Sequence, residues 1–392
     1  MQPICVCGRL TAGLSLRLTL RLSLLSAVCL WIVLCAPVAS AGHIRVSDGK
    51  HGYEGKVVSL SKSKCSLLDR QGKLIHLDVK SLKTFEKVSA RYQPYSQSAF
   101  RQELQKEFPD YEVVGATHYL VVGPRGRASA FARLFDAIYR DVEQFYRVRG
   151  FRVRTPEVPL VAIVFGSQQE FVNYCVRDKV PPSPTLLGYY SLLSNRVALF
   201  DDGRRISKLQ PAGDVFDRYQ SILGASGISG DTANTIVHET THQVGYNIGV
   251  HSRLGTTPLW LVEGLATVLE PDAMRSSRGR NLLSDRLNPE RSHWFANVHR
   301  PKRRTGNLAM LVASDDYFHK HVLDSYSESW AFTFFLLENA ARRQQLVKYI
   351  QAVNARDPQA TYTARERLQD FQSAFGDISR LEVEFIRHMD RM

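Results

Sequence analysis

Cysteine is scarce over most of this chain. Of six cysteines among 392 residues, four lie within the first 41 positions, which leaves Cys65 and Cys175 beyond them. One pair so far apart in sequence does not define a disulfide framework. The two residues either form a disulfide in an oxidising compartment or remain two buried thiols. A chain of this length buries enough core that neither a disulfide nor a metal is needed merely for folding.

Acidic residues are too few to balance the basic ones. The chain has 51 lysines and arginines against 38 aspartates and glutamates, for a formal net charge of +13. This excess predicts attraction to anionic polymers or lipid surfaces of the cell envelope. The densest basic run, from Arg300 to Arg304, is equally typical of a solvated loop, and no nucleic-acid-binding motif accompanies it. We therefore expect no specific nucleic-acid partner.

The first 21 residues contain three arginines and no acid, and an uncharged stretch over residues 22–41 follows them. A basic start, an apolar run and a final Ala-Ser-Ala predict a secretory signal peptide over residues 1–41, removed before Gly42. The protein would then be exported to the periplasm, the cell surface or the medium. An uncleaved N-terminal membrane anchor is the alternative, because about 20 uncharged residues can span a bilayer.

Residues 42–88 show short apolar runs separated by turn residues, with a hairpin signal at Arg70-Gln71-Gly72. This stretch resembles the small SH3-like β modules that precede other domains in exported bacterial proteins. Such a module would act as a spacer or attach the protein to a partner. Residues 89–99 are rich in Ser, Gln and Tyr and predict a linker.

The remainder, residues 100–392, predicts one α+β domain. Short strands come first, with an amphipathic helix over residues 128–148 and a buried strand that begins at Pro159. A hairpin that turns near Ser194-Asn195 follows, and the chain from about Thr232 onward is nearly all helical. Strands first and helices after are typical of the α+β class.

The clearest candidate for a metal-binding motif is His238-Glu239-Thr240-Thr241-His242. We expect a helix here, capped by Asp231 and ended by Gly249. His238 and His242 would lie one turn apart and point the same way, so that both imidazoles can reach one ion. Glu239 sits just off the pair, where its carboxylate can reach the water of a metal site without binding the metal. The alternative is an ordinary solvated helical face.

A catalytic zinc site needs a third protein ligand. The spacing of metzincins would place it at position 248, which is Ile248, so that arrangement is rejected. His251 comes three residues later, beyond the expected helix end, and remains a distant alternative.

Glu263 is the stronger candidate. It lies mid-helix among Leu261, Val262 and Leu265, where a carboxylate is costly unless it is paired. Gly264 beside it would allow another backbone or side chain to come close. Glu270 is the competing acid, but it falls near the end of this helix, where we expect it to be solvated.

Together, His238-Glu239-x-x-His242 and Trp260-Leu-Val-Glu263-Gly264 resemble the gluzincin metallopeptidases. Within them the chain is most similar to the exported bacterial group DUF1570, common in planctomycetes. The resemblance covers roughly residues 100–392. It implies that His238, His242 and Glu263 are zinc ligands and that Glu239 is the general base.

The resemblance implies two further features, and at one position this chain differs from many gluzincins. The hairpin that ends in Arg196–Phe200 would provide the edge strand along which an extended peptide lies. Related gluzincins often place a tyrosine at the mouth of the site, and Tyr326, near the start of a long helix, is the candidate; its ring could equally be a packing element. Many gluzincins also have an acid four residues after the ligand glutamate, but Thr267 stands there, which implies a weaker or different support for the ligand histidine.

These observations predict a Zn²⁺-dependent hydrolase of peptide or protein substrates that acts outside the cytoplasm. Two alternatives remain: a metal-bearing but inactive scaffold that binds envelope components, and a hydrolase of another bond on the same site.

The signal-peptide prediction can be checked directly. Intact-mass analysis or N-terminal sequencing of the exported protein should give a chain that begins at Gly42. Retention of Met1 would contradict the cleavage and favour the membrane anchor.

Overall fold

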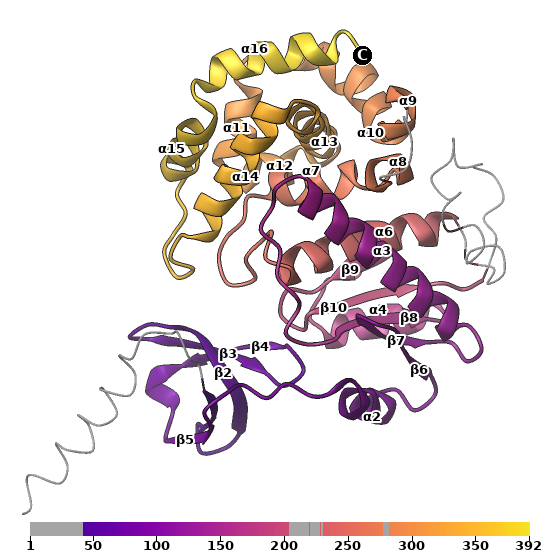
Figure 1. Cartoon of the computed structure of the whole chain (residues 1–392), viewed down its shortest axis with the longest axis vertical. Helices are drawn as coiled ribbons and strands as arrows, with labels where there is room; N and C mark the ends of the chain where they lie inside the picture. Colours follow the sequence, from indigo (N-terminus) through magenta and orange to yellow (C-terminus); the bar gives the residue numbers. More distant parts are fainter. Residues whose placement is uncertain (1–41, 204–218, 220–227, 229, 277–281) are drawn as a thin grey trace, which may run out of the picture.

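The computed structural model describes residues 42–203, 219, 228, 230–276 and 282–392. The predicted signal peptide lies outside these ranges, as does most of the segment before the histidine motif. Within them, no helix is both long and apolar enough to cross a membrane. The described chain forms a small antiparallel sheet, a mixed sheet between helices and a helical C-terminal half, in that order (Figure 1). The predicted α+β class is confirmed at this level.

The N-terminal sheet has five strands in the order β4-β3-β2-β1-β5, with every neighbouring pair antiparallel. Gly72, with a φ of +83°, makes the β3–β4 hairpin at the predicted turn. The strands and a short 3-10 turn are β1 (His43–Ser47), β2 (Gly52–Leu60), β3 (Lys64–Asp69), β4 (Leu74–Asp78), η2 (Val79–Ser81) and β5 (Thr84–Ser89).

This small sheet rests against the rest of the protein beside that hairpin. The backbone N–H of Leu74 donates to the carbonyl of Leu193 at 2.8 Å, and that of Tyr95 donates to the carbonyl of Arg70 at 2.9 Å. Leu193 belongs to the turn between two strands of the second sheet, so the module contacts the main domain at that turn.

The second sheet has the order β6-β7-β8-β10-β9. The β7, β8 and β10 strands are parallel, and the two edge strands, β6 and β9, are antiparallel to their neighbours. Asn195, with a φ of +60°, closes the β9–β10 hairpin at the predicted position. The elements are α2 (Gln97–Glu107), β6 (Glu112–Gly115), β7 (Tyr119–Gly123), α3 (Ala128–Val148), β8 (Leu160–Phe165), α4 (Gln168–Arg177), β9 (Gly188–Tyr190) and β10 (Arg196–Phe200).

Side chains of this sheet alternate between two cores, because successive strand residues point to opposite faces. In β8, Leu160, Ala162 and Val164 pack with α3 and the later helices, whereas Val161 and Ile163 pack with α2 and α4. The α3 helix covers residues 128–148 as predicted, with its apolar stripe in the first core. Both faces of the sheet are therefore covered.

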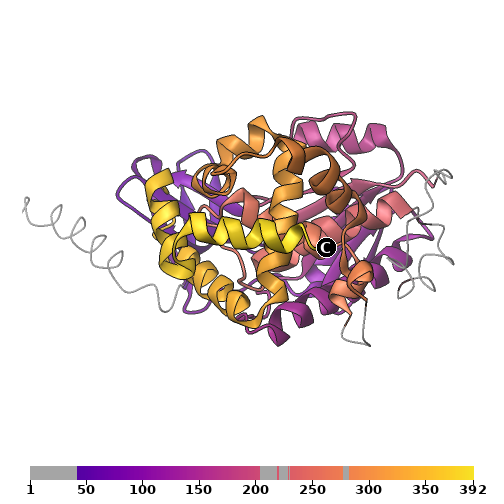
Figure 2. The ribbon, with the colours of Figure 1, turned by 90° about the horizontal axis from the view of Figure 1, so that it is seen from above.

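The C-terminal half is helical, as predicted, and lies on the same side of the mixed sheet as α3 (Figure 1). The chain ends on α16, at the outer surface of this half (Figure 2). Its elements are α6 (Gly230–Asn247), α7 (Leu259–Val268), α8 (Asp272–Arg275), α9 (Leu283–Arg286), α10 (Pro289–Trp294), η3 (Phe295–His299), η4 (Arg300–Lys302), α11 (Asn307–Ala313), α12 (Asp315–Lys320), α13 (Val322–Glu338), α14 (Ala340–Asn354), α15 (Ala364–Phe375) and α16 (Ile378–Met389).

The helix that carries the two histidines, α6, begins and ends close to the positions predicted from the sequence. The α6 helix begins at Gly230, so Asp231 lies within the helix. The prediction that Asp231 precedes and caps it is wrong. It ends at Asn247, and Gly249 follows with a φ of +90°, a conformation that favours glycine. The α7 helix begins at Leu259, directly after Pro258.

The two cysteines are free and occupy different cores. Cys65 lies in the core of the N-terminal sheet, and Cys175 lies between α4 and the second sheet. Burial raises the pKa of both thiols, which disfavours the reactive thiolate. Of the two alternatives left open by the sequence, the structure shows the buried thiols.

Helices α7 and α13 approach closely at Gly264. A Cβ atom there would collide with Thr333 Oγ1 and would lie 2.7 Å from the backbone oxygen of Ser329. The expectation that this glycine admits another chain segment is confirmed.

Replacement of Gly264 by alanine should therefore force the two helices apart. We expect a loss of about 1–3 kcal/mol in the free energy of unfolding, the usual cost of overpacking, measured by urea denaturation. Gly166→Ala is the matched control, because a Cβ there meets nothing closer than 3.8 Å. Equal stability of the two variants would contradict the packing described for α7 and α13.

Candidate metal centre

The α6 helix is anchored to the second sheet one residue after the second histidine. Gln243 is fully buried, and its Oε1 accepts a hydrogen bond from the Tyr119 hydroxyl at 2.8 Å. Its Nε2 donates to the carbonyls of Val161 at 3.0 Å and Asn195 at 2.8 Å. Because Gln243 points at the sheet, His242 beside it is turned away from the sheet, toward the helical half.

The structure brings His238, His242 and Glu263 together. The two Nε2 atoms lie 3.0 Å apart, and Glu263 Oε2 is 3.3 Å from His238 Nε2 and 3.4 Å from His242 Nε2. One ligand atom from each residue falls within 4.8 Å of the others, so the three could hold a metal ion. Their side chains are only 10–18% exposed. Two residues come from α6 and one from α7, as the sequence predicted.

Glu263 shows that this group suits a cation. Its Oε2 is buried and has no hydrogen-bond partner among the described residues, although it lies between two imidazoles. Burial alone would raise the pKa of Glu263, but His242 and His238 outweigh it, and the pKa falls well below its usual range. A carboxylate kept charged, with an unused oxygen aimed at two imidazole nitrogens, is the donor set that a divalent metal needs.

His238 is held from behind by Glu270. Its Nδ1 lies 2.9 Å from Glu270 Oε1, so a proton on Nδ1 leaves the Nε2 lone pair free to bind a metal. Burial lowers the pKa of His238, but the nearby carboxylates of Glu263 and Glu270 outweigh burial and raise the pKa. Asn288 in turn donates to Glu270 Oε2 at 2.5 Å and to the carbonyl of Thr267 at 3.1 Å. The expectation that Glu270 is solvated is wrong, because its side chain is only 22% exposed and bridges two helices.

Thr267 does not replace the acid that gluzincins often carry at this position. Its hydroxyl donates to the backbone carbonyl of Glu263 at 2.7 Å, one turn back in α7. The supporting acid is Glu270, which lies seven residues after Glu263 and just beyond the end of α7. The support of the histidine is therefore different from the expected pattern, and it is not missing.

Glu239 lies beside the three residues, half-buried. Burial raises the pKa of its carboxyl, while His238 and His242 lower it and Glu263 raises it further. The backbone N–H of Tyr190, at the end of β9, also acts on this carboxyl and lowers its pKa. A raised pKa brings a carboxylate closer to the range in which it exchanges protons near neutral pH.

Tyr326 faces the same group from α13. Its ring packs edge-on against Phe318, with 5.0 Å between the ring centres. Burial raises the pKa of its hydroxyl, and the charges of Glu263 and Glu239 raise it further. The ring is thus a packing element and the hydroxyl also faces the two acids, whereas its role at an oxyanion stays a prediction.

The sheet edge nearest the centre is β9. The predicted hairpin lies at the edge, but the strand Arg196–Phe200 does not, because β10 pairs with β8 on one side and β9 on the other. Tyr190 in β9 is the strand residue that acts on Glu239. The free side of β9 therefore lies next to the candidate centre.

His251 does not join the group. It is 3% exposed, its Nδ1 has no hydrogen-bond partner among the described residues, and burial lowers its pKa to about 3. The ring packs against Gly245 and Tyr246, one helical turn after His242 in α6. The structure therefore favours Glu263 over His251 as the third ligand.

The roles of Glu270 and Asn288 were not predicted from the sequence. Asn288 lies 18 positions after Glu270, and only the turn through α8 and α9 brings them together. The one local signal was the Asn-Pro pair at residues 288–289, which predicts a helix start. Asn288 does begin α10, where its Oδ1 accepts the N–H of Arg291.

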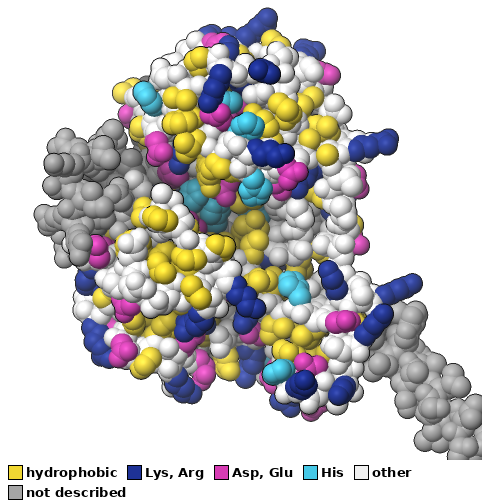
Figure 3. Space-filling view, turned by 180° about the vertical axis from the view of Figure 1, so that it is seen from behind, with side chains coloured by type: hydrophobic (Ala, Val, Ile, Leu, Met, Phe, Trp, Pro, Cys, Tyr) yellow, Lys and Arg dark blue, Asp and Glu magenta, His cyan; other side chains and the backbone are white. Residues whose placement is uncertain are grey.

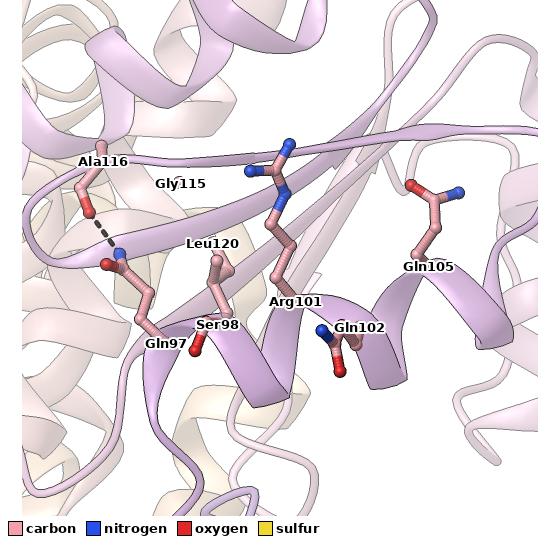
Figure 4. Close-up of a pocket in the computed structure, with 8 residues that line it drawn as sticks. All are labelled: Gln97, Ser98, Arg101, Gln102, Gln105, Gly115, Ala116 and Leu120. Carbon is pink, nitrogen blue, oxygen red and sulfur yellow. Dashed lines mark hydrogen bonds between the residues drawn. The ribbon is translucent and has the colours of Figure 1, made fainter.

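The molecular surface is hollowed where histidine side chains gather between the helical half and the sheet half (Figure 3). A separate cavity of about 670 Å³ lies between α2 and strands β6 and β7. Gln97, Arg101 and Gln105 line it, and Gln97 donates to the carbonyl of Ala116 (Figure 4). No residue of the metal centre lines this cavity.

Comparison with known families gives one match. Residues 232–360 match the family described as "Protein of unknown function (DUF1570)". The match begins within α6 and ends after α14, so it contains His238, His242, Glu263 and Tyr326. No curated protein matches the chain. This domain and a triad that resembles the HExxH…E arrangement are therefore established, without a substrate or a reaction.

The ligand set predicts a graded loss of metal. Purified His242→Ala and Glu263→Gln should each lose most of their zinc affinity, because each removes one of three ligands. Glu270→Gln should weaken binding by about 10–100-fold, the scale for an outer-shell partner. Affinity is measured by competition with a chromophoric chelator.

Glu384→Gln, an exposed acid on α16, serves as the control and should bind zinc like the wild type. Zinc binding that depends more on Glu270 or His251 than on Glu263 would show that the third ligand is misassigned.

Proposed function

We propose that this protein is a zinc-dependent peptidase that acts outside the cytoplasm. The observation that carries the proposal is the convergence of His238, His242 and Glu263 beside a fourth, half-buried group, Glu239, which is not needed to complete the ligand set. A purely structural site would not require that carboxylate. The match to the DUF1570 family is compatible with this reading but names no activity.

The three ligands would hold the ion through His238 Nε2, His242 Nε2 and a Glu263 carboxylate oxygen. Bound there, zinc would polarise a peptide carbonyl and acidify a water molecule toward a pKa of ~7. Glu270 Oε1, 2.9 Å from His238 Nδ1, would accept the Nδ1 proton and so leave Nε2 for the ion. Asn288 fixes Glu270 in turn.

Glu239 is the proposed general base. Its carboxylate would take a proton from the attacking water and pass it to the leaving amine, a transfer favoured by its raised pKa. Tyr326 keeps its proton because its pKa is raised, so its hydroxyl can donate a hydrogen bond to the oxyanion that develops on the substrate carbonyl.

An extended substrate would pair with the free side of β9. Edge strands present unpaired backbone groups that an added peptide strand can satisfy. The action of the Tyr190 N–H on Glu239 supports this placement, because it puts the edge within reach of the proposed base.

Export and attachment are also part of the proposal. They rest on the basic and apolar N-terminal 41 residues and on the net charge of +13. The five-stranded module would hold the enzyme at an anionic polymer or lipid surface of the envelope. A catalytically inactive, metal-bearing scaffold remains the second candidate, because the same charge and module would serve it equally well.

The base can be separated from the ligands by mutation. Glu239→Gln should retain about one zinc per chain and a melting temperature close to that of the wild type. Its turnover of library peptides, measured by mass spectrometry, should fall by at least ~10²-fold, the usual scale for loss of a general base.

Tyr326→Phe should also keep the metal and lose ~10²–10³-fold in turnover if the hydroxyl serves the oxyanion. A Glu239→Gln protein that cleaves as fast as the wild type would remove this mechanism. A wild type that binds zinc but cleaves no peptide would favour the scaffold.

A further inference from the structure

Arg291 stands beside the candidate centre, and none of the described residues is a buried acid that pairs with it. It belongs to α10, the helix that begins at Asn288 and is tied through Glu270 to His238. Its guanidinium lies over the ring of Tyr326, 5.1 Å from the ring centre. The charge of Arg291 also acts on the Tyr326 hydroxyl, which faces Glu263 and Glu239.

The hydrogen-bonding capacity of Arg291 is largely unused. Its side chain is 18% exposed, and its Nε is buried with no hydrogen-bond partner among the described residues. Its ion pair is with the adjacent Glu290, 3.1 Å away, whose side chain is 76% exposed. A pair with so exposed an acid contributes little.

Other poorly exposed arginines of the described chain are matched more fully. Arg303 bonds to both Glu328 and Glu382 in the interior. Arg367 holds Asp315 with two hydrogen bonds. Against these, Arg291 carries donors that its own fold does not use, at the place where a substrate would lie.

We propose that Arg291 binds a carboxylate of the substrate close to the bond that is cleaved. A guanidinium presents donors in a planar fork that matches a carboxylate. From its position over the Tyr326 ring, it would reach a group of the substrate near the scissile bond. The substrate class is a peptide with an acidic side chain or a free C-terminal carboxylate near that bond. This inference rests on the proposed function, since it assumes that peptides enter the centre.

Binding of matched peptides tests the assignment. Two pairs of short fluorescein-labelled peptides serve as probes. The members of the first pair differ only in carrying Glu or Gln at the central position. The members of the second pair differ only in having a free or an amidated C-terminus. Their affinities for the zinc-loaded Glu239→Gln protein, which should bind without cleaving, are measured by fluorescence anisotropy. We expect the charged member of at least one pair to bind about 10–100-fold more tightly, the scale for a hydrogen bond to a charged group. The pair that shows the preference identifies the source of the carboxylate.

Variants assign the preference to one residue. Arg291→Gln should abolish it, and Arg291→Lys should keep only part of it, because lysine retains the charge but not the fork. Arg304→Gln removes the same charge from an exposed position and should leave the preference intact. Melting temperatures identify a variant that fails to fold, in which case the lysine variant carries the test.

The outcomes separate this inference from the peptidase proposal. Equal binding of charged and neutral probes, or a preference that survives Arg291→Gln, would overturn the role of Arg291. If the preference depends on Arg291 but the wild-type protein cleaves none of the probes, carboxylate binding is supported and the peptidase proposal fails. Wild-type cleavage of charged and neutral peptides at equal rates would leave the peptidase and remove the anchor.

Discussion

A carboxylate placed inside a helix bundle is the constraint on which the rest of the centre depends. Glu263 sits mid-helix, 14% exposed, with an oxygen that no described residue satisfies by a hydrogen bond. An unpaired charge in such a place is costly. Two imidazoles from the neighbouring helix reduce this cost, and a shared cation would remove most of it. The close approach of α7 and α13 at Gly264 holds Glu263 in this position.

The surrounding residues keep the two histidines ready for a metal. The hydrogen bonds of Gln243 fix the rotation of α6 against the sheet, and His242 faces the helical half. Glu270 lies against Nδ1 of His238, and Asn288 donates a hydrogen bond to Glu270. Each of these groups is buried or half-buried and bonded to the next, so the geometry of the centre does not depend on exposed, mobile side chains. Chemistry would then be left to Glu239 and Tyr326, which border the ligands.

Features set by local spacing could be predicted from the sequence. The helix over residues 128–148 follows from its apolar stripe, and the shared direction of His238 and His242 follows from their separation. Glu263 was identified because an acid among apolar helix residues needs a partner. Features set by distant segments were missed or misjudged. Glu270 meets His238 and Asn288 only in the folded chain, and the parallel pairing of β10 with β8, which moves the edge to β9, leaves no local signal. The separate cores of Cys65 and Cys175 are equally a property of the fold.

X-ray absorption at the zinc edge of the purified wild-type protein tests the central claim most directly. We expect about one zinc per chain, bound by nitrogen and oxygen at about 2.0–2.2 Å with the scattering pattern of two imidazoles. A protein that takes up no metal, or one whose zinc is bound by sulfur at about 2.3 Å, would contradict the assignment of His238, His242 and Glu263.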